Sequence, residues 1–185
     1  MRHPIQERQA SWMKVRQYIP QVSSPLFHAT TGPRAANIVL RGQGIKADSG
    51  FSNYGGNVYG ISMSRDLGFL LNGGFGGYIF VFEHRELAAK FRINPFQAGL
   101  VGDEFEERVE AKHIPASMVR GVIFAGRTPR RYELKEWSEE VTYPIIYKDK
   151  ASKWQSYHPV SPAMGKPHVE GVHVASKPFQ KNCPA

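Results

Sequence analysis

The chain has 185 residues, of which 41% are hydrophobic and 12% aromatic, and its 24 Lys and Arg outnumber its 16 Asp and Glu by eight charges. This composition excludes global disorder, and the length suits one domain with a full core. The single cysteine, Cys183, excludes an internal disulfide and a cysteine-based zinc cluster. No apolar run approaches the ~20 residues of a membrane span, and no signal-peptide stretch opens the chain, so we expect no membrane partner and a cytoplasmic location.

The positive charge is concentrated at the two ends. Residues 1–20 hold four basic residues against one acidic residue, and residues 146–185 hold six lysines against two acidic residues. The stretch 21–145 is nearly balanced, with 14 basic and 13 acidic residues. Basic ends of this kind either dock on a polyanion such as nucleic acid or only aid solubility, and both interpretations stay open.

The first third of the chain predicts alternating helices and strands. Apolar spacing predicts a helix over 5–18 that stops before Pro20, and the apolar run 26–30 predicts a strand. A helix over 33–41 follows, since Pro33 suits a first turn and Gly42 suits a helix end. The Gly-, Ser- and Asn-rich stretch 42–57 predicts a long loop.

The middle of the chain continues the alternation. We expect a strand at 58–63, a short helix at 65–71 and a flexible connection at the glycine-rich 73–77. The nearly unbroken apolar run 78–82 predicts an interior strand. A polar helix at 84–90 and a loop at 94–103 follow.

Glu107 stands out in the segment 103–110. If this segment is extended, Phe105, Glu107 and Val109 share one face, because side chains alternate along a strand. A carboxylate on an apolar face needs a partner, a raised pKa or a ligand, unless the strand lies at an exposed edge. Both the functional and the exposed-edge interpretation remain open.

The last third predicts a strand at 121–124, a helix at 132–141 and a short strand at 145–147, followed by a polar, mostly irregular tail. We therefore expect an N-terminal helix (1–20) packed on the body, a central domain (21–147) and a basic tail (148–185).

Other candidate residues carry two interpretations each. His28 lies within an apolar strand, where a histidine is either hydrogen-bonded in the core or in contact with a ligand. Ser62 and Ser64 share one face of a strand, and either hydroxyl could cap the next helix. Phosphate-loop, zinc-site and nucleophile-elbow patterns do not occur, so we expect no metal.

The order of these motifs resembles the ADP-ribosyltransferase family. The run Leu26-Phe27-His28-Ala29-Thr30 resembles its first motif, and Gly60-Ile61-Ser62-Met63-Ser64-Arg65-Asp66 resembles its second motif in phage and bacterial members. Glu106-Glu107-Arg108-Val109, followed by Ile114-Pro115, is similar to the glutamate segment of the DNA-modifying toxins of this family. The resemblance covers about residues 26–124.

The resemblance implies an α+β fold, with a pair of small mixed β-sheets around an NAD cleft and flanking helices. It implies NAD as co-substrate and Glu107 as the catalytic residue. It also implies that the cofactor is bound by His28, Thr30, Arg34, Ser62, Ser64 and Arg65. Phe105 stands two residues before Glu107, where arginine-modifying members carry Glu. In the alternative register Glu106 is catalytic and Glu104 occupies that place.

The resemblance further implies a monomeric mono-ADP-ribosyltransferase, in a phage or bacterial conflict setting. Together with the basic ends, it predicts a nucleic acid or a nucleic-acid-associated protein as acceptor. Two alternatives remain open. One is an NAD glycohydrolase, which shares every site residue, and the other is a non-enzymatic basic protein that binds nucleic acid.

Overall fold

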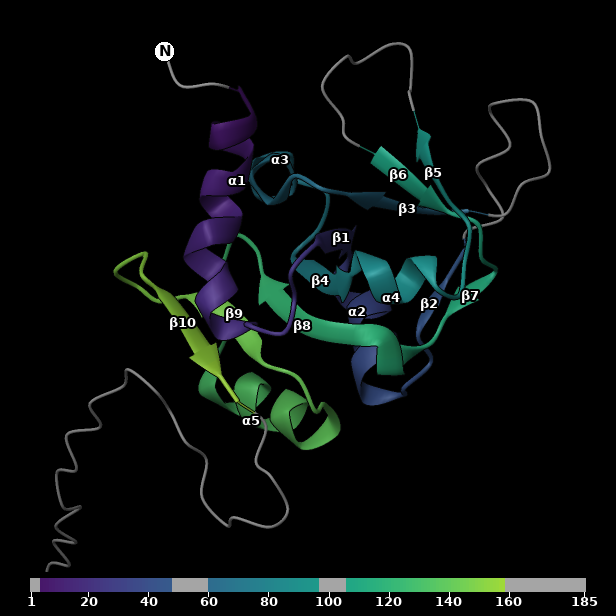
Figure 1. Cartoon of the computed structure of the whole chain (residues 1–185). Helices are drawn as coiled ribbons and strands as arrows, with labels where there is room; N and C mark the ends of the chain where they lie inside the picture. Colours follow the sequence, from purple (N-terminus) through teal and green to yellow (C-terminus); the bar gives the residue numbers. More distant parts are fainter. Residues whose placement is uncertain (1–3, 48–59, 97–105, 159–185) are drawn as a thin grey trace, which may run out of the picture.

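The computed structural model describes residues 4–47, 60–96 and 106–158, which form an α+β fold (Figure 1). The helices are α1 (Pro4–Val15), α2 (Gly32–Leu40), α3 (Leu67–Asn72), α4 (His84–Ala88) and α5 (Arg131–Glu140), with 3-10 turns at Arg16–Tyr18 and Ala116–Met118. The strands are β1 (Pro25–Thr30), β2 (Ile45–Lys46), β3 (Ile61–Ser64), β4 (Tyr78–Glu83), β5 (Ile93–Phe96), β6 (Glu106–Val109), β7 (His113–Ile114), β8 (Val119–Phe124), β9 (Ile145–Lys148) and β10 (Trp154–Tyr157). None of the helices in these three ranges has the length and apolar character needed to cross a bilayer.

Eight strands form one mixed sheet in the order β10-β9-β8-β4-β1-β3-β6-β5, and β2 pairs with β7 in a separate sheet of two strands. Neighbours in the large sheet are antiparallel, except that β8 and β9 run parallel. The expected pair of small sheets is therefore wrong. Backbone pairing of Phe27 with Ser64 joins β1 to β3, so the strands on either side belong to one large sheet.

Helices cover both faces of the large sheet. On one face, α1 and α3 bury Trp12 and Leu67 in a cluster with Phe27 and Ile79. The N-terminal helix α1 therefore contributes to the core on this face of the sheet. The burial of these large apolar side chains is the main favourable contribution to folding on this face.

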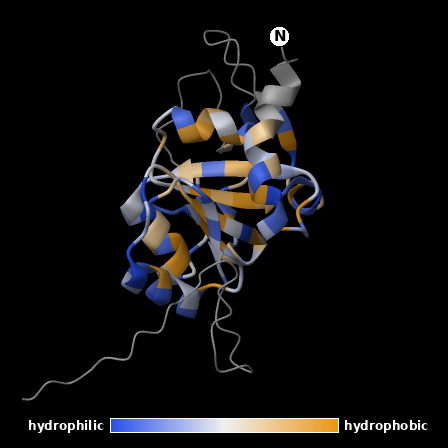
Figure 2. Cartoon of the chain, turned by 90° about the vertical axis from the view of Figure 1, so that its left-hand side faces the viewer, coloured by the Kyte–Doolittle hydropathy of each residue, from blue (hydrophilic) through white to orange (hydrophobic). Residues whose placement is uncertain are grey.

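The opposite face is covered by α2, α4 and α5. Ile38 of α2 and Trp137 of α5 pack in one cluster with Phe80 and Phe82 of β4. All six residues of β4 are buried because this strand has helices on both sides and a strand on each edge. Figure 2 shows the same arrangement, with hydrophobic residues running through the central strands and hydrophilic residues gathered on the outer helices and connections.

The structure changes three of the expected boundaries. The stretch predicted as a loop from residue 42 contains β2, and the one predicted from residue 94 begins inside β5. The tail predicted to be irregular from residue 148 contains β10, which forms a hairpin with β9. These short strands lack an apolar run of their own, and partner strands supply the pairing that local sequence does not predict.

A buried carboxylate, Glu83, fixes the start of β1 against the end of β4. Its two oxygens accept hydrogen bonds from the backbone N–H of Ser23 (2.6 Å), Ser24 (3.1 Å) and Arg85 (3.2 Å) and from the Ser23 hydroxyl (3.2 Å). Burial raises the pKa of Glu83, but these hydrogen bonds outweigh it, so that its pKa lies below the ordinary value. The ionised carboxylate therefore stabilises the entry to the central strand.

Replacing Glu83 tests this interaction. Glu83→Gln leaves one acceptor oxygen and turns an NH₂ group toward backbone donors, so we expect a loss of about 1–3 kcal/mol in the free energy of unfolding at neutral pH. A carboxylate whose pKa is lowered on folding contributes stability above its unfolded pKa and loses it as pH falls through the folded pKa. Denaturant titrations should therefore show the difference shrinking below about pH 4.5.

The matched control is Glu86→Gln on α4, the helix that Glu83 caps. Glu86 pairs with Arg120 at a partly exposed position, so this change should cost under about 1 kcal/mol. A Glu83→Gln variant as stable as the wild type at neutral pH would contradict the assignment.

Candidate functional site

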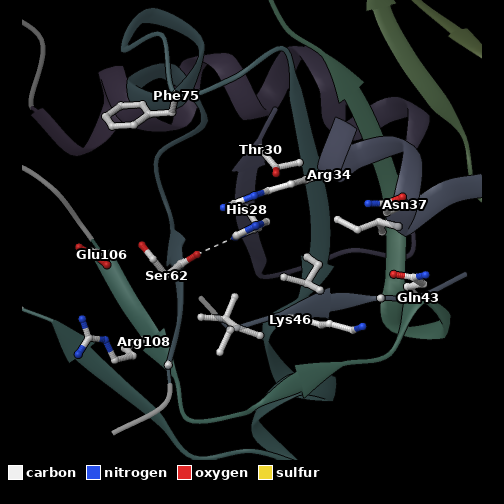
Figure 3. Close-up of a pocket in the computed structure, with 16 residues that line it drawn as sticks. His28, Thr30, Arg34, Asn37, Gln43, Lys46, Ser62, Phe75, Glu106 and Arg108 are labelled. Atoms are coloured by element: carbon white, nitrogen blue, oxygen red, sulfur yellow. Dashed lines mark hydrogen bonds between the residues drawn. The ribbon is translucent and has the colours of Figure 1, made fainter. Parts of the chain in front are cut away.

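An opening between β1 and β3 defines the site. β1 pairs with β4 along all six of its residues, but with β3 the described pairing consists of Phe27 opposite Ser64. Beyond this point the end of β1 and the start of β3 separate. A histidine side chain occupies the gap in place of a backbone ladder, with His28 Nδ1 lying 2.9 Å from the carbonyl oxygen of Ser62 (Figure 3).

This contact fixes the tautomer of His28. A carbonyl oxygen only accepts hydrogen bonds, so Nδ1 carries the proton and donates to Ser62. Burial lowers the pKa of His28, the bond to Ser62 raises it, and the nearby Arg34 guanidinium lowers it, with a net decrease. The ring is therefore neutral at physiological pH, and its Nε2 is an acceptor.

The gap opens into a pocket of about 570 Å³, within the usual range for small-molecule sites. Its walls come from the end of β1, from α2, from the Gln43–Ala47 segment around β2 and from the starts of β3 and β6. Among the described residues, three cationic side chains, Arg34, Lys46 and Arg108, line it together with one carboxylate, Glu106. The pocket therefore favours a ligand that carries more than one negative charge.

A smaller lobe of about 160 Å³ continues from the same opening. Its walls are mostly apolar and include Phe69, Leu70 and Phe75. Phe75 packs on Phe69 with ring centroids 4.9 Å apart, and 45% of its surface is exposed. This lobe offers aromatic surface to a flat, uncharged group.

Four residues line both lobes: His28, Ser62, Phe75 and Glu106. Figure 3 shows Ser62 between Glu106 on one side and His28 on the other. A carboxylate, a neutral histidine and a hydroxyl thus meet where a cationic lobe joins an aromatic one.

Strand register decides which glutamate reaches the pocket. Ser62 lies opposite Arg108 and Ser64 opposite Glu106, so these four residues share one side of the β3–β6 pair. Glu106 and Arg108 line the pocket, whereas Glu107, one residue away, points to the other side.

Glu107 instead takes part in an ion-pair cluster. Its Oε1 accepts a hydrogen bond from Arg65 Nε, and its Oε2 lies 3.8 Å from His84 Nε2. The side chain is 14% exposed, and Oε2 is buried without a hydrogen-bond partner among the described residues. The structure therefore brings the predicted Glu107 and Arg65 together, but neither lines the two lobes described above.

The remaining predicted residues divide between the two lobes. His28, Thr30, Arg34 and Ser62 line the larger lobe, and Ser64 lines the smaller one. The Ser64 hydroxyl also accepts a hydrogen bond from Asp66 N–H (3.0 Å), and Asp66, rather than a serine, caps α3.

Sequence reasoning missed several lining residues: Asn37, Gln43, Lys46, Phe75 and Arg108. Arg108 had a detectable signal, because strand alternation places it with Glu106. Its side chain lies over Gly60, where a Cβ would collide with Arg108 Cγ and Cδ, so glycine is required for this close approach. Phe75 lies in the glycine-rich run that predicts only flexibility.

The described residues contain no group of three or more His, Cys, Asp or Glu side chains arranged to hold a metal ion. The donors in the pocket are instead suited to hydrogen bonding and charge pairing with an organic anion.

The His28 tautomer is directly testable. Nitrogen-15 NMR of the imidazole should show a neutral ring protonated on Nδ1 at pH 7, with a titration midpoint below the ordinary histidine value near 6.5. A ring protonated on Nε2 would contradict the bond to Ser62. A midpoint at or above the ordinary value would contradict the burial that lowers the pKa of His28.

Comparison with known proteins adds no relative. No protein-family model, curated protein or solved structure matches the chain at a significant level. Its function must therefore be inferred from the chemistry of the pocket.

Proposed function

We propose that the protein is an NAD-dependent mono-ADP-ribosyltransferase that uses Glu106 as its catalytic carboxylate. The observation that carries the proposal is the meeting of Glu106, His28 and Ser62 at the junction of a cationic lobe and an aromatic lobe. NAD has the matching layout, since a diphosphate lies on one side of its nicotinamide ribose and a flat ring on the other.

The lining of the larger lobe matches the diphosphate and adenosine portion of NAD. Arg34 and Arg108 carry guanidinium groups, which pair with phosphate oxygens through charge-assisted hydrogen bonds, and Lys46 adds a third positive charge. Asn37, Gln43 and Thr30 supply neutral hydrogen-bonding groups along the same walls. These side chains suit a polar ligand with two phosphates.

The apolar lining of the smaller lobe matches the nicotinamide ring of NAD. Phe75, Phe69 and Leu70 offer apolar surface, and Phe75 is placed to stack on a flat ring. Gly76 holds this segment against the end of β1, because its backbone packs on the Thr30 carbonyl so closely that a Cβ would collide with it. Its φ of 137° also favours glycine.

The chemistry follows from the position of Glu106. The bond between ribose C1′ and the pyridinium nitrogen breaks with its electron pair moving to nitrogen, so that nicotinamide leaves neutral and positive charge develops on the ribose. The Glu106 carboxylate stabilises that charge and accepts a hydrogen bond from the ribose 2′-hydroxyl. An acceptor nucleophile then bonds to C1′, and its proton passes to Glu106.

His28 and Ser62 serve as binding and positioning groups. The neutral His28 ring can accept a hydrogen bond from a ribose hydroxyl at Nε2, while its Nδ1–H keeps the ring fixed on Ser62. The Ser62 hydroxyl lines both lobes and is placed to bond to the ribose or to Glu106.

The choice of Glu106 bears on the acceptor. With Glu106 catalytic, Glu104 stands two residues earlier in the sequence, where the resembled arginine-modifying enzymes carry Glu. Glu104 lies outside the described residues. This register supports arginine in a protein, including one associated with nucleic acid, as the group that receives ADP-ribose.

Activity assays test the proposal with a matched pair of variants. Purified protein incubated with NAD and cell lysate should release nicotinamide and give ADP-ribosylated product detectable by mass spectrometry. Glu106→Gln should lower the rate by about 100-fold or more, because the electrostatic stabilisation of the transition state is lost. NAD should still raise the melting temperature of this variant.

Glu107→Gln is the control, since its side chain belongs to the cluster with Arg65 and His84. It should retain at least about a tenth of the activity per folded molecule, even where its melting temperature falls. The proposal fails if the wild type releases no nicotinamide, or if Glu107→Gln loses as much activity as Glu106→Gln. Release of free ADP-ribose with no modified macromolecule would indicate hydrolysis in place of transfer.

A further inference from the structure

Two segments remote in sequence form a cationic surface outside the pocket. Residues 126–131 follow β8, and residues 148–154 run from the end of β9 through the next turn to the start of β10. Because β8 and β9 run parallel, both segments emerge at the same edge of the sheet (Figure 1). The Thr128 hydroxyl joins them by donating to the carbonyl of Lys148 (2.8 Å). We call this surface the cationic ledge, and its six cations are Arg127, Arg130, Arg131, Lys148, Lys150 and Lys153.

Within the two segments little negative charge opposes these cations. All six residues are exposed, and the two segments contain one acidic residue, Asp149. The Asp149 carboxylate is turned toward its own turn, accepting hydrogen bonds from the N–H of Ala151 and Lys153 and from the Gln155 amide, each at 2.9 Å. Arg127 is paired with Glu133 of α5, and the other five cations belong to exposed residues.

Aromatic rings accompany the cations. Tyr132 is 63% exposed, and the Arg130 guanidinium lies 6.0 Å from its ring centroid. Lys148 Nζ lies 5.0 Å from the ring centroid of the partly exposed Trp154. Cations interleaved with accessible rings are the surface that proteins use to bind single-stranded nucleic acid, because bases stack on the rings and phosphates pair with the cations.

The ledge lies at the edge of the sheet where the pocket opens. In the register of β1, β4 and β8, Thr30 of the pocket is opposite Tyr78, and Tyr78 is opposite Phe124, two residues before the ledge segment. Arg127 reaches back along this edge and donates to the Tyr78 hydroxyl (2.8 Å). A strand of nucleic acid on the ledge would therefore be held at the side of the pocket.

We propose that the cationic ledge binds the phosphate backbone of single-stranded nucleic acid and so docks the acceptor, or the complex that carries it, beside the pocket. An acidic protein would use the cations but not the exposed rings, so nucleic acid is the better match. The inference extends the proposed function by placing its docking surface, but the binding itself needs no NAD.

Binding to a fluorescent oligothymidylate of about 20 nucleotides tests the ledge. The double variant Arg130→Gln, Lys150→Gln removes two exposed cations from it. The matched control Arg85→Gln, Lys90→Gln removes two exposed cations after the end of β4, which runs antiparallel to β1 and β8 and so ends at the opposite edge. Each protein is titrated by fluorescence anisotropy without NAD, from about 50 to about 200 mM salt.

We expect the ledge variant to bind roughly tenfold more weakly at low salt, with a salt slope reduced by about 1 to 1.5, because each lost phosphate contact removes about 0.7 from the slope for a single strand. The control should bind like the wild type. Equal losses of oligonucleotide affinity in both variants, or no loss in the ledge variant, would overturn the proposal. So would a ledge variant that loses affinity only for polyglutamate, a probe that stands for an acidic protein.

Nicotinamide release, measured on the same proteins without a macromolecular acceptor, separates this inference from the proposed function. The ledge variant should cleave NAD at the wild-type rate. If oligonucleotide binding depends on the ledge but no protein cleaves NAD, the proposed enzymatic function is wrong and the ledge proposal stands. If the proteins cleave NAD but oligonucleotide binding does not depend on the ledge, the ledge proposal alone is wrong.

Discussion

The arrangement of the site depends on an unequal pairing of β1. Its six residues are fully bonded to β4 on one side, and on the other side the described pairing to β3 consists of Phe27 with Ser64. An interior strand with unpaired backbone would be costly, but His28 satisfies the Ser62 carbonyl from across the gap. One side chain thus bonds the Ser62 carbonyl across the gap, and the opening joins the cationic lobe to the aromatic one.

The same opening explains why neighbouring glutamates differ in role. Glu106 lies on the side of β6 that faces the gap with Ser62, and Glu107 faces Arg65 and His84. The ion pair with Arg65 accounts for a carboxylate on an otherwise apolar side, since burial of a charge requires a partner. The proposed catalytic glutamate and the glutamate in the ion pair are therefore adjacent residues on one strand.

Sequence patterns predicted the helices and most strands, because apolar periodicity reports local structure. Five residues that the family resemblance implies as cofactor-binding line the two lobes. The alternation of side chains in 103–110 also predicted that Glu107 shares the side of Val109. A carboxylate on that side was expected to need a partner, a raised pKa or a ligand. Which side faces the pocket depends on the register of β6 against β3, a non-local property. Lys46 and Phe75 come from segments whose position is set by Gly44 and Gly76 packing on distant carbonyls, which no local pattern reveals.

A crystal structure of the Glu106→Gln variant soaked with NAD tests the central claim most directly, since the variant should bind NAD without cleaving it. We predict nicotinamide in the lobe beneath Phe75, the ribose C1′ beside the side chain at position 106, and the diphosphate against Arg34. NAD bound away from the gap between β1 and β3, or with its ribose beside Glu107, would contradict the account.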